Sequence, residues 1–225
     1  MDISKNVQTI QDKIEEICDR IGRNPKSVSI VGVTKYVDAE VANQLLESGI
    51  SHLGENRPEV LIEKINAIEK NVNWHFVGSL QSRKVRGIID QVDYLHSLDR
   101  LRLAQEIDKH APCKVKCFVQ VNVSKEESKH GIDQKQLIDF IMALKAYPKI
   151  EVVGLMTMAP FTEDQSAIRH CFKELKSLQL AVQNLNLSYA PCKELSMGMS
   201  NDFEIAIEEG ATFIRLGRSL TEVQV

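Results

Sequence analysis

The chain has 225 residues and carries 28 basic and 31 acidic side chains, which gives a formal net charge of −3. This balance argues against a dedicated nucleic-acid-binding protein, because phosphate contacts require a surplus of basic residues. Apolar residues make up 43% of the chain and charged residues 26%, which is ordinary for a globular protein and too apolar for a disordered one.

The sequence contains no targeting or membrane segment that we can identify. No apolar run approaches the roughly 18–20 residues that span a bilayer, and the first twenty residues lack the apolar core of a signal peptide. The five cysteines are scattered and odd in number, which favours free thiols in a reducing cytosol over disulfides or a zinc site. We therefore expect a cytoplasmic protein without a membrane partner, folded as a single domain over residues 1–225.

Short apolar runs alternate with longer amphipathic ones along the chain. The first segment predicts a helix that ends at Gly22, because its apolar residues recur every three or four positions. Eight strands are then expected: SVSIVGVTK ending at Lys35, residues 52–54, WHFVG, VDYLH, KCFVQVNV, EVVGLMTM, KELSM and TFIRLG. Helices are expected between these strands. Asp38 and Asp99 are predicted caps, Pro58 lies in a first turn, and Asn201 with Glu204 forms a predicted capping box. A further helix is expected at residues 83–89.

Alternation of strands with helices predicts an α/β fold with a parallel sheet, since parallel strands need crossover connections. A count of eight strands favours a closed (β/α)₈ TIM barrel. An open doubly wound sheet remains the alternative, because the second and seventh strands are short. Only seven helices lie between the strands, and we expect the extra N-terminal helix to fill the missing place in the outer ring.

In such a barrel, functional residues lie at the carboxyl ends of the strands. Lys35 ends the first predicted strand and shares its parity with Val31 and Val33, so the three side chains point to one face. If that face is the barrel interior, the lysine stem lies against hydrocarbon and a desolvated amine is available to form a Schiff base with an aldehyde. The alternative is a lysine that leaves the strand into solvent.

Two further segments at the last strand ends point to an anion. In SMGMSN, which includes Ser196 and Met197, Ser200 or Asn201 stands at a predicted helix start, where free N–H groups favour negative charge. In RLG, Arg215 has the parity of a residue that faces the mouth, and Gly217 allows N–H groups to approach a phosphate. Loops seven and eight are the usual phosphate site of these barrels. The alternatives are an ordinary capped helix and an arginine that neutralises an acidic residue inside the barrel.

Together these features describe a ligand with an aldehyde at one end and a phosphate at the other. Pyridoxal 5′-phosphate (PLP) fits this description, and so do aldehyde-bearing sugar phosphates. Asn56 is a weaker candidate that either bonds the ligand or caps its helix. His75 and His96 are either ligand contacts or satisfied core histidines, and Lys129 lies in a solvated loop from which it could meet an anion.

Other chemistries find little support in the sequence. There is no G-x-S-x-G elbow, no G-x-G-x-x-G loop and no Walker A loop. The remaining histidines show no spacing typical of metal ligands: His52, His110, His130 and His170. We therefore expect no metal site.

Seven separated blocks resemble, in this order, those of the pyridoxal phosphate homeostasis proteins, which are single-domain relatives of the alanine racemase N-terminal barrel. The blocks are GVTKYV, HLGEN, WHFVGSLQSRK, NVSKEESKHGI, GLMTMAP, LSMGMSNDFEIAIEEGAT and IRLGRSL. The resemblance implies a PLP barrel of fold type III with Lys35 as the Schiff-base lysine. It also implies that the phosphate is held by Ser200 and by the backbone at Gly217 and Arg218.

The resemblance places further residues near the cofactor. It implies that Asn56, His75, Ser196 and Met197 belong to the cofactor site, and that Arg215 faces the pyridine nitrogen. An arginine can only donate, so it weakens the ring as an electron sink. Two departures from the family pattern are the tail at residues 221–225 and the pair after Lys35, which is Tyr-Val here where some relatives have a second lysine.

We expect from this resemblance a non-enzymatic, monomeric protein that holds PLP as a lysine aldimine and supplies it to apo-enzymes. The related racemases carry an additional domain with a second catalytic base, for which a barrel of 225 residues has no room. The alternative is a PLP-dependent amino-acid racemase, lyase or transaminase, with Tyr36 or His75 as the extra base. A Schiff-base aldolase acting on sugar phosphates is a third possibility.

Overall fold

The computed structural model describes residues 2–124 and 130–222 of the chain. Within these residues, eight parallel strands pair in chain order and the eighth pairs with the first, so the sheet closes into a barrel. The strands are β1 (Ser29–Val33), β2 (His52–Glu55), β3 (Asn73–Phe76), β4 (Tyr94–Leu98), β5 (Val115–Gln120), β6 (Ile150–Met156), β7 (Glu194–Ser196) and β8 (Phe213–Leu216). The pairing of β1 with β8 confirms the predicted (β/α)₈ barrel and rules out the open sheet.

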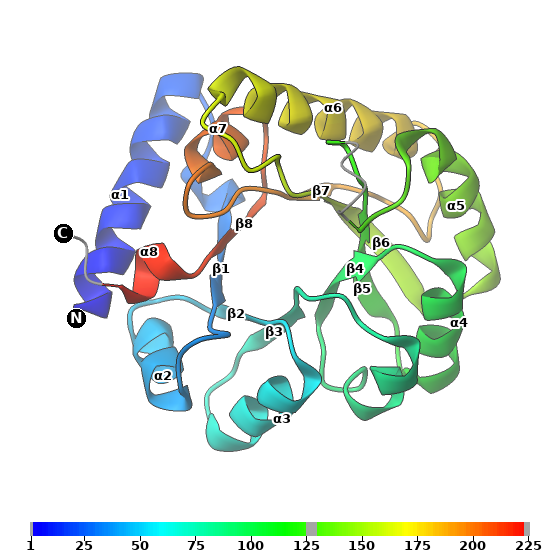
Figure 1. Ribbon diagram of the computed structural model, residues 1–225, viewed down its shortest axis with the longest axis horizontal. Coiled ribbons are helices and arrows are strands. Elements are labelled where there is room, and N and C mark those ends of the chain that lie inside the picture. The colour runs from blue at the N-terminus through cyan, green and yellow to red at the C-terminus, as the bar shows by residue number, and fades with distance from the viewer. Residues whose placement is uncertain (1, 125–129, 223–225) are drawn as a thin grey trace.

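Helices surround the barrel (Figure 1). In chain order, the helical elements of the described residues are α1 (Ile3–Ile21), η1 (Pro25–Ser27), α2 (Ala39–Glu47), α3 (Pro58–Ala67), η2 (Ser82–Gly87), α4 (Leu101–His110), η3 (Gln134–Gln136), α5 (Leu137–Ala143), η4 (Leu144–Ala146), α6 (Gln165–Gln183), α7 (Phe203–Glu208) and α8 (Arg218–Thr221). The η elements are short 3₁₀ helices. One of them, η2, stands where the sequence predicted a helix at residues 83–89.

Several predicted helix boundaries are confirmed. Gly22 ends α1 in the left-handed region, at φ 67°. Asp38 caps α2 by accepting a hydrogen bond from the Val41 N–H at 2.9 Å. Pro58 opens α3, where its missing N–H costs nothing.

Two predicted caps are wrong, and several predicted strand ends differ from those of the structure. The N-cap of α4 is Arg100, because the Asp99 carboxylate pairs with the Arg100 guanidinium instead. The N-cap of α7 is Asp202 rather than Asn201, and Glu204 pairs with Lys13 of α1 at 3.1 Å. The first strand ends at Val33, two residues before Lys35.

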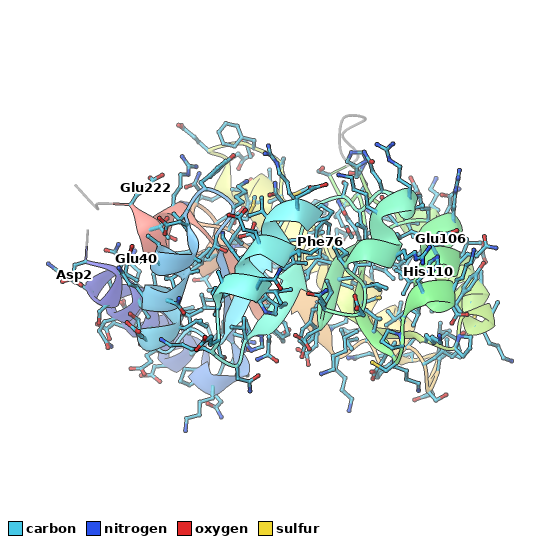
Figure 2. All side chains as sticks on the ribbon, turned by 90° about the horizontal axis from the view of Figure 1, so that it is seen from below. Asp2, Glu40, Phe76, Glu106, His110 and Glu222 are labelled. Atoms are coloured by element: carbon cyan, nitrogen blue, oxygen red, sulfur yellow. The ribbon has the colours of Figure 1, made fainter. Side chains whose placement is uncertain are left out.

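The N-terminal helix takes the predicted place in the outer ring. It packs against α2, α7 and α8, and the Asn6 side chain donates hydrogen bonds to the carbonyls of Leu220 and Glu222 at 3.1 and 3.0 Å. Both ends of the described chain therefore meet on one side of the barrel, where Asp2 and Glu222 are labelled in Figure 2. The sequence did not predict α8, which follows the last strand.

Apolar side chains pack in two layers. The inner layer joins strands from opposite sides of the barrel and therefore fills its interior: Val31, Phe118, Val153, Met156 and Phe213. The outer layer lies between the sheet and the helices and is much larger. Each fully buried aliphatic or aromatic side chain contributes about 1.5–3 kcal/mol to folding. Polar groups that share the interior lose their contacts with water, so they need hydrogen-bond partners within the protein.

Three further observations concern the described residues. None of their helices combines the length and the apolar character needed to cross a membrane. No three of their His, Cys, Asp or Glu side chains are grouped so as to hold a metal ion. All five cysteines are free thiols, and four of them are buried.

Candidate functional site

Lys35 stands at the carboxyl end of β1, where the barrel opens. Val31 lies in the interior layer, whereas a side chain at Gly32 would point outward to Leu45 and Ile50. Lys35 follows the end of β1 by two residues and lies in a turn, so the alternation of the strand does not set the direction of its side chain. Its side chain is exposed, and its Nζ lies 4.8 Å from the ring centroid of the exposed Tyr36. The lysine therefore follows the alternative of a side chain that leaves the strand into solvent, because β1 ends two residues earlier and leaves it at the open rim.

The backbone just before Lys35 is fixed by a buried ion pair that the sequence analysis missed. Lys64 Nζ donates to the Thr34 carbonyl at 2.5 Å and also pairs with Glu55. The Thr34 hydroxyl donates to the same Glu55 oxygen at 2.5 Å. Glu55 is 0% exposed and Lys64 3%. A lysine three positions after Leu61, on the buried face of α3, was the available signal.

Hydroxyl and backbone groups from the last two loops gather beside the end of β1. The Ser200 and Ser219 hydroxyl oxygens lie 3.0 Å apart. Gly217 packs so closely on β1 that an added Cβ would lie 3.3 Å from the Val33 carbonyl oxygen. Arg218 follows as the first residue of α8 and is exposed. The structure thus brings these predicted phosphate-site residues together and adds Ser219.

The loop that carries Ser200 is tightly turned. Gly198 has φ 91°, and an added Cβ would come within 2.6 Å of the Ala206 side chain. The Asp202 carboxylate accepts a hydrogen bond from the Met199 N–H at 2.5 Å, and the Asp202 N–H donates to the Met199 carbonyl at 3.0 Å. The turn fixes where the Ser200 hydroxyl stands.

Arg215 lies inside the barrel and is 6% exposed. Its Nη1 donates to the Ser196 hydroxyl oxygen at 2.5 Å, and its Nη2 donates to the Thr157 carbonyl at 3.0 Å. Burial lowers the pKa of Arg215 to about 10, while the charge of Asp202 acts in the opposite direction. The guanidinium therefore stays protonated at neutral pH and can only donate hydrogen bonds.

The structure places the side chains of two predicted site residues away from the mouth. His75 is 0% exposed, and its ring nitrogens lie 2.8 Å from His52 Nδ1 and 2.7 Å from His96 Nε2. This is the alternative of a satisfied core histidine. Met197 is fully buried in the outer apolar layer, because it follows the inward-facing Ser196.

Asn56 follows β2 and is half-buried. Its backbone lies against Gly78, where an added Cβ would be 2.4 Å from the Asn56 carbonyl oxygen. Asn56 is not the cap of α3, because the N-cap is Arg57. The remaining candidate, Lys129, lies outside the described residues.

Taken together, the rim offers an amine, paired hydroxyls and backbone at the start of α8, with a buried cation in the barrel below. Lys35 supplies the amine, Ser200 and Ser219 supply the hydroxyls, and Arg215 supplies the cation. A primary amine attacks carbonyl carbons, and hydroxyls beside a helix start suit an anionic group. This arrangement fits a small molecule that carries both a reactive carbonyl and an anionic group.

Comparisons with known proteins agree with this geometry. Residues 6–224 match the family model described as alanine racemase, N-terminal domain. The chain is 35% identical to the pyridoxal phosphate homeostasis protein of Aquifex aeolicus, over 98% of this chain and 97% of that protein. It is 31% identical to the protein of that name from Escherichia coli, over 97% and 95% of the two chains.

A solved structure is also similar. PipY of Synechococcus elongatus, determined with PLP bound, superposes with a TM-score of 0.81 at 30% identity, and the match covers 92% of this chain and 99% of that one. The chain therefore belongs to the pyridoxal phosphate homeostasis protein family, whose barrel is that of the alanine racemase N-terminal domain.

Proposed function

We propose that this protein binds PLP through a covalent bond to Lys35 and takes part in intracellular PLP homeostasis, without strong catalysis of its own. The observation that carries the proposal is the meeting of the Lys35 segment with Gly217 and the Ser200–Ser219 pair at the junction of β1 and β8. PLP has an aldehyde and a phosphate, which are the two groups that this junction suits. The names of the relatives and the PLP bound in PipY support it.

The residues fit the cofactor on their own chemistry. Ser200, Ser219 and the backbone at Gly217 and Arg218 would hold the phosphate, and Asn56 stands at the neighbouring strand end. Arg215 would meet the pyridine nitrogen as a permanent donor, held in place by Ser196 and Thr157. His75 and Met197 would contribute indirectly, through the core and the backbone.

When bound, PLP supplies a carbonyl that captures amines and a ring that withdraws electrons. A donor at the ring nitrogen keeps that nitrogen unprotonated and limits the withdrawal. Arg215 is buried and held by two hydrogen bonds, so a small movement of the chain cannot replace it with an acidic side chain. This supports a storage role over a catalytic one.

The same proposal has three further parts. The domain spans residues 1–225 as one cytoplasmic barrel that acts as a monomer. PLP held in it would be kept from reacting with other amines. Apo-enzymes that require PLP would be the recipients.

A PLP-dependent racemase or lyase is the second candidate. Tyr36 favours it, because its ring is 82% exposed and lies 4.8 Å from the Lys35 amine, where a phenol could exchange a proton with a bound substrate. Purified protein loaded with PLP should be incubated with a panel of amino acids. We expect no turnover, and turnover at ordinary enzymatic rates would overturn the storage role.

PLP binding is tested by loading the purified chain, dialysing it and recording its absorption. We expect a yellow protein that retains one PLP after reduction with borohydride, with the added mass on Lys35. Lys35→Ala should abolish the colour and the label. Lys173→Ala, which changes an exposed lysine on α6, should leave both unchanged. A colourless wild type that takes up no PLP would refute the assignment.

A further inference from the structure

Three histidines form a continuous row through the interior of the barrel. His52 Nδ1 lies 2.8 Å from His75 Nε2, and His75 Nδ1 lies 2.7 Å from His96 Nε2. They stand on the neighbouring strands β2, β3 and β4. Aromatic stacking holds the rings in place. The ring centroids of His75 and Tyr94 lie 4.5 Å apart, and those of His96 and Phe118 lie 4.4 Å apart.

The two ends of this row lie in different places. At the inner end, His96 Nδ1 is 2.8 Å from the Ser196 hydroxyl oxygen, which also receives the Arg215 Nη1–H. At the outer end, the half-buried His52 lines a hollow of about 450 Å³ at the amino-terminal end of the barrel, beside Glu15 and Lys26. The row thus connects a surface far from the mouth to the arginine of the proposed PLP site.

A neutral histidine has one N–H and one bare nitrogen, which imposes a rule on the row. If His75 donates to one neighbour, it must accept from the other. The whole row therefore has two consistent arrangements, with the proton on Nε2 in all three rings or on Nδ1 in all three. A mixed arrangement would leave two donors or two bare nitrogens facing each other at under 3 Å.

Ser196 selects between the two arrangements. Arg215 can only donate to the Ser196 oxygen, so the Ser196 proton needs an acceptor, and His96 Nδ1 is the acceptor among the contacts of the described residues. This places the proton on Nε2 in every ring and directs the His52 Nε2–H toward the outer end.

We propose that His52, His75, His96 and Ser196 form a relay that couples the protonation of His52 to the hydrogen bond between Ser196 and Arg215. Charged His52 has N–H groups on both nitrogens, so it must donate to His75. His75 and His96 then carry their protons on Nδ1, and His96 donates to Ser196, whose own proton loses His96 Nδ1 as its acceptor while its oxygen still receives the Arg215 Nη1–H. His52 gains one proton from water, and His75, His96 and Ser196 each carry the same number of protons as before.

The surroundings make His52 the place where the proton enters. Burial lowers the pKa of His52, and it lowers those of His75 and His96 well below the usual value. Asp93 favours charge on His52, Lys116 opposes it there and on His75, and Arg215 opposes it on His96. Tyr94, Glu15 and Lys26 are the other titratable groups beside His52 or the hollow.

The relay is tested by ¹⁵N NMR of the histidine rings in the PLP-free protein, titrated with acid. At high pH we expect the Nε2–H form in all three rings. As His52 gains its proton, His75 and His96 should change together to the Nδ1–H form with the same midpoint, and the Arg215 Nε–H signal should shift with them. The relay would be overturned if His75 and His96 carried opposite tautomers at high pH. It would also be overturned if the signals of the two rings or of Arg215 did not change as His52 titrates.

Two variants make the comparison specific. His52→Phe keeps a ring in the half-buried position and should abolish the response of His75 and His96. His110 pairs with Glu106 at 3.4 Å on the outside of α4 (Figure 2), so His110→Phe should leave that response intact. The wild-type titration alone decides the proposal if a variant fails to fold. Because no PLP is present, failure here leaves the proposed PLP binding untouched.

Discussion

Lys64 of α3 donates a hydrogen bond to the carbonyl oxygen of Thr34, the residue that immediately precedes Lys35. The same ammonium group pairs with Glu55, and both side chains are almost fully buried. A helix on the outside of the barrel therefore fixes the backbone from which the candidate Schiff-base lysine projects. The Lys64–Glu55 pair therefore acts on Lys35 by fixing the position of its backbone.

Replacing Lys64 by methionine should destabilise the protein strongly. The Glu55 carboxylate would remain buried without its cation, and breaking a buried pair in this way costs about 3–5 kcal/mol. Urea unfolding measures the loss. Lys70→Met is the matched control, since Lys70 and Glu47 form an exposed pair whose loss should cost no more than about 1 kcal/mol.

The double variant Lys64→Met with Glu55→Gln separates charge from packing. It removes both charges, so much of the lost stability should return. If the single variant proves as stable as Lys70→Met, the buried pair does not hold this end of β1.

Acid should destabilise the fold through the interior histidines. In the unfolded chain they take up protons near the ordinary pKa of about 6.5, whereas burial lowers the pKa of His75 and His96 well below that value in the folded chain. The unfolded state then binds more protons, so stability falls as the pH drops below about 6.5 and keeps falling until the folded-state pKa is reached. Each histidine contributes up to about 1.4 kcal/mol per pH unit.

Urea unfolding at a series of pH values from 7.5 to 5 checks this sign. His75→Phe should make the slope shallower, whatever it does to stability at pH 7.5. His110→Phe makes the same change at a histidine outside the row, on the outer helix α4, and is the control for the substitution. A stability that rises on acidification would contradict the neutral state of the row.

Much of the fold follows from local sequence. Gly22 and Pro58 mark a helix end and a helix start by backbone chemistry alone. The alternation along the strands put Val31 on one face with Val33 and Lys35, and it allowed Arg215 a place at the mouth or inside the barrel. The structure has Val31 and Arg215 inside. The closure of the sheet followed from the count of strands.

The features that the sequence analysis did not predict depend on contacts between distant segments. Asn201 is a good cap by type, but Asp202 takes the position because its carboxylate closes the turn onto Met199. His52 shows no recognisable spacing, and its partner His75 is 23 positions away on the next strand. Ser219 belongs to the site only because α8 follows the closing strand beside Ser200. Register and closure create these pairs.

The Ser200–Ser219 pair predicts a phosphate-specific loss of affinity. Ser200→Ala and Ser219→Ala should each weaken PLP binding about tenfold, because a hydrogen bond to a charged group contributes about 1.5–3 kcal/mol. Binding of pyridoxal, which lacks the phosphate, should change little. Spectroscopic titration with both compounds measures the difference, and Ser177→Ala on the exposed face of α6 is the control. Equal losses for PLP and pyridoxal would place the phosphate elsewhere.

Arg215 predicts a change in the colour of the loaded protein without loss of the covalent bond. Arg215→Gln removes the buried cation but keeps an amide that can donate to Ser196 or Thr157, so the interior retains a polar partner. Lys35 is untouched, and borohydride should still fix PLP on it. The absorption maximum or the affinity should shift, because the variant lacks the guanidinium that we propose as the donor to the ring nitrogen.

Arg102→Gln is the matched control, since Arg102 is exposed on α4 and its loss should alter neither quantity. Absorption spectra and PLP titrations of the three proteins at one pH make the comparison. A variant at Arg215 with the spectrum and affinity of the wild type would remove this arginine from the cofactor site. A variant that loses the covalent bond altogether would instead mean that Arg215 is needed to seat PLP within reach of Lys35, which follows the neighbouring strand β1 by two residues.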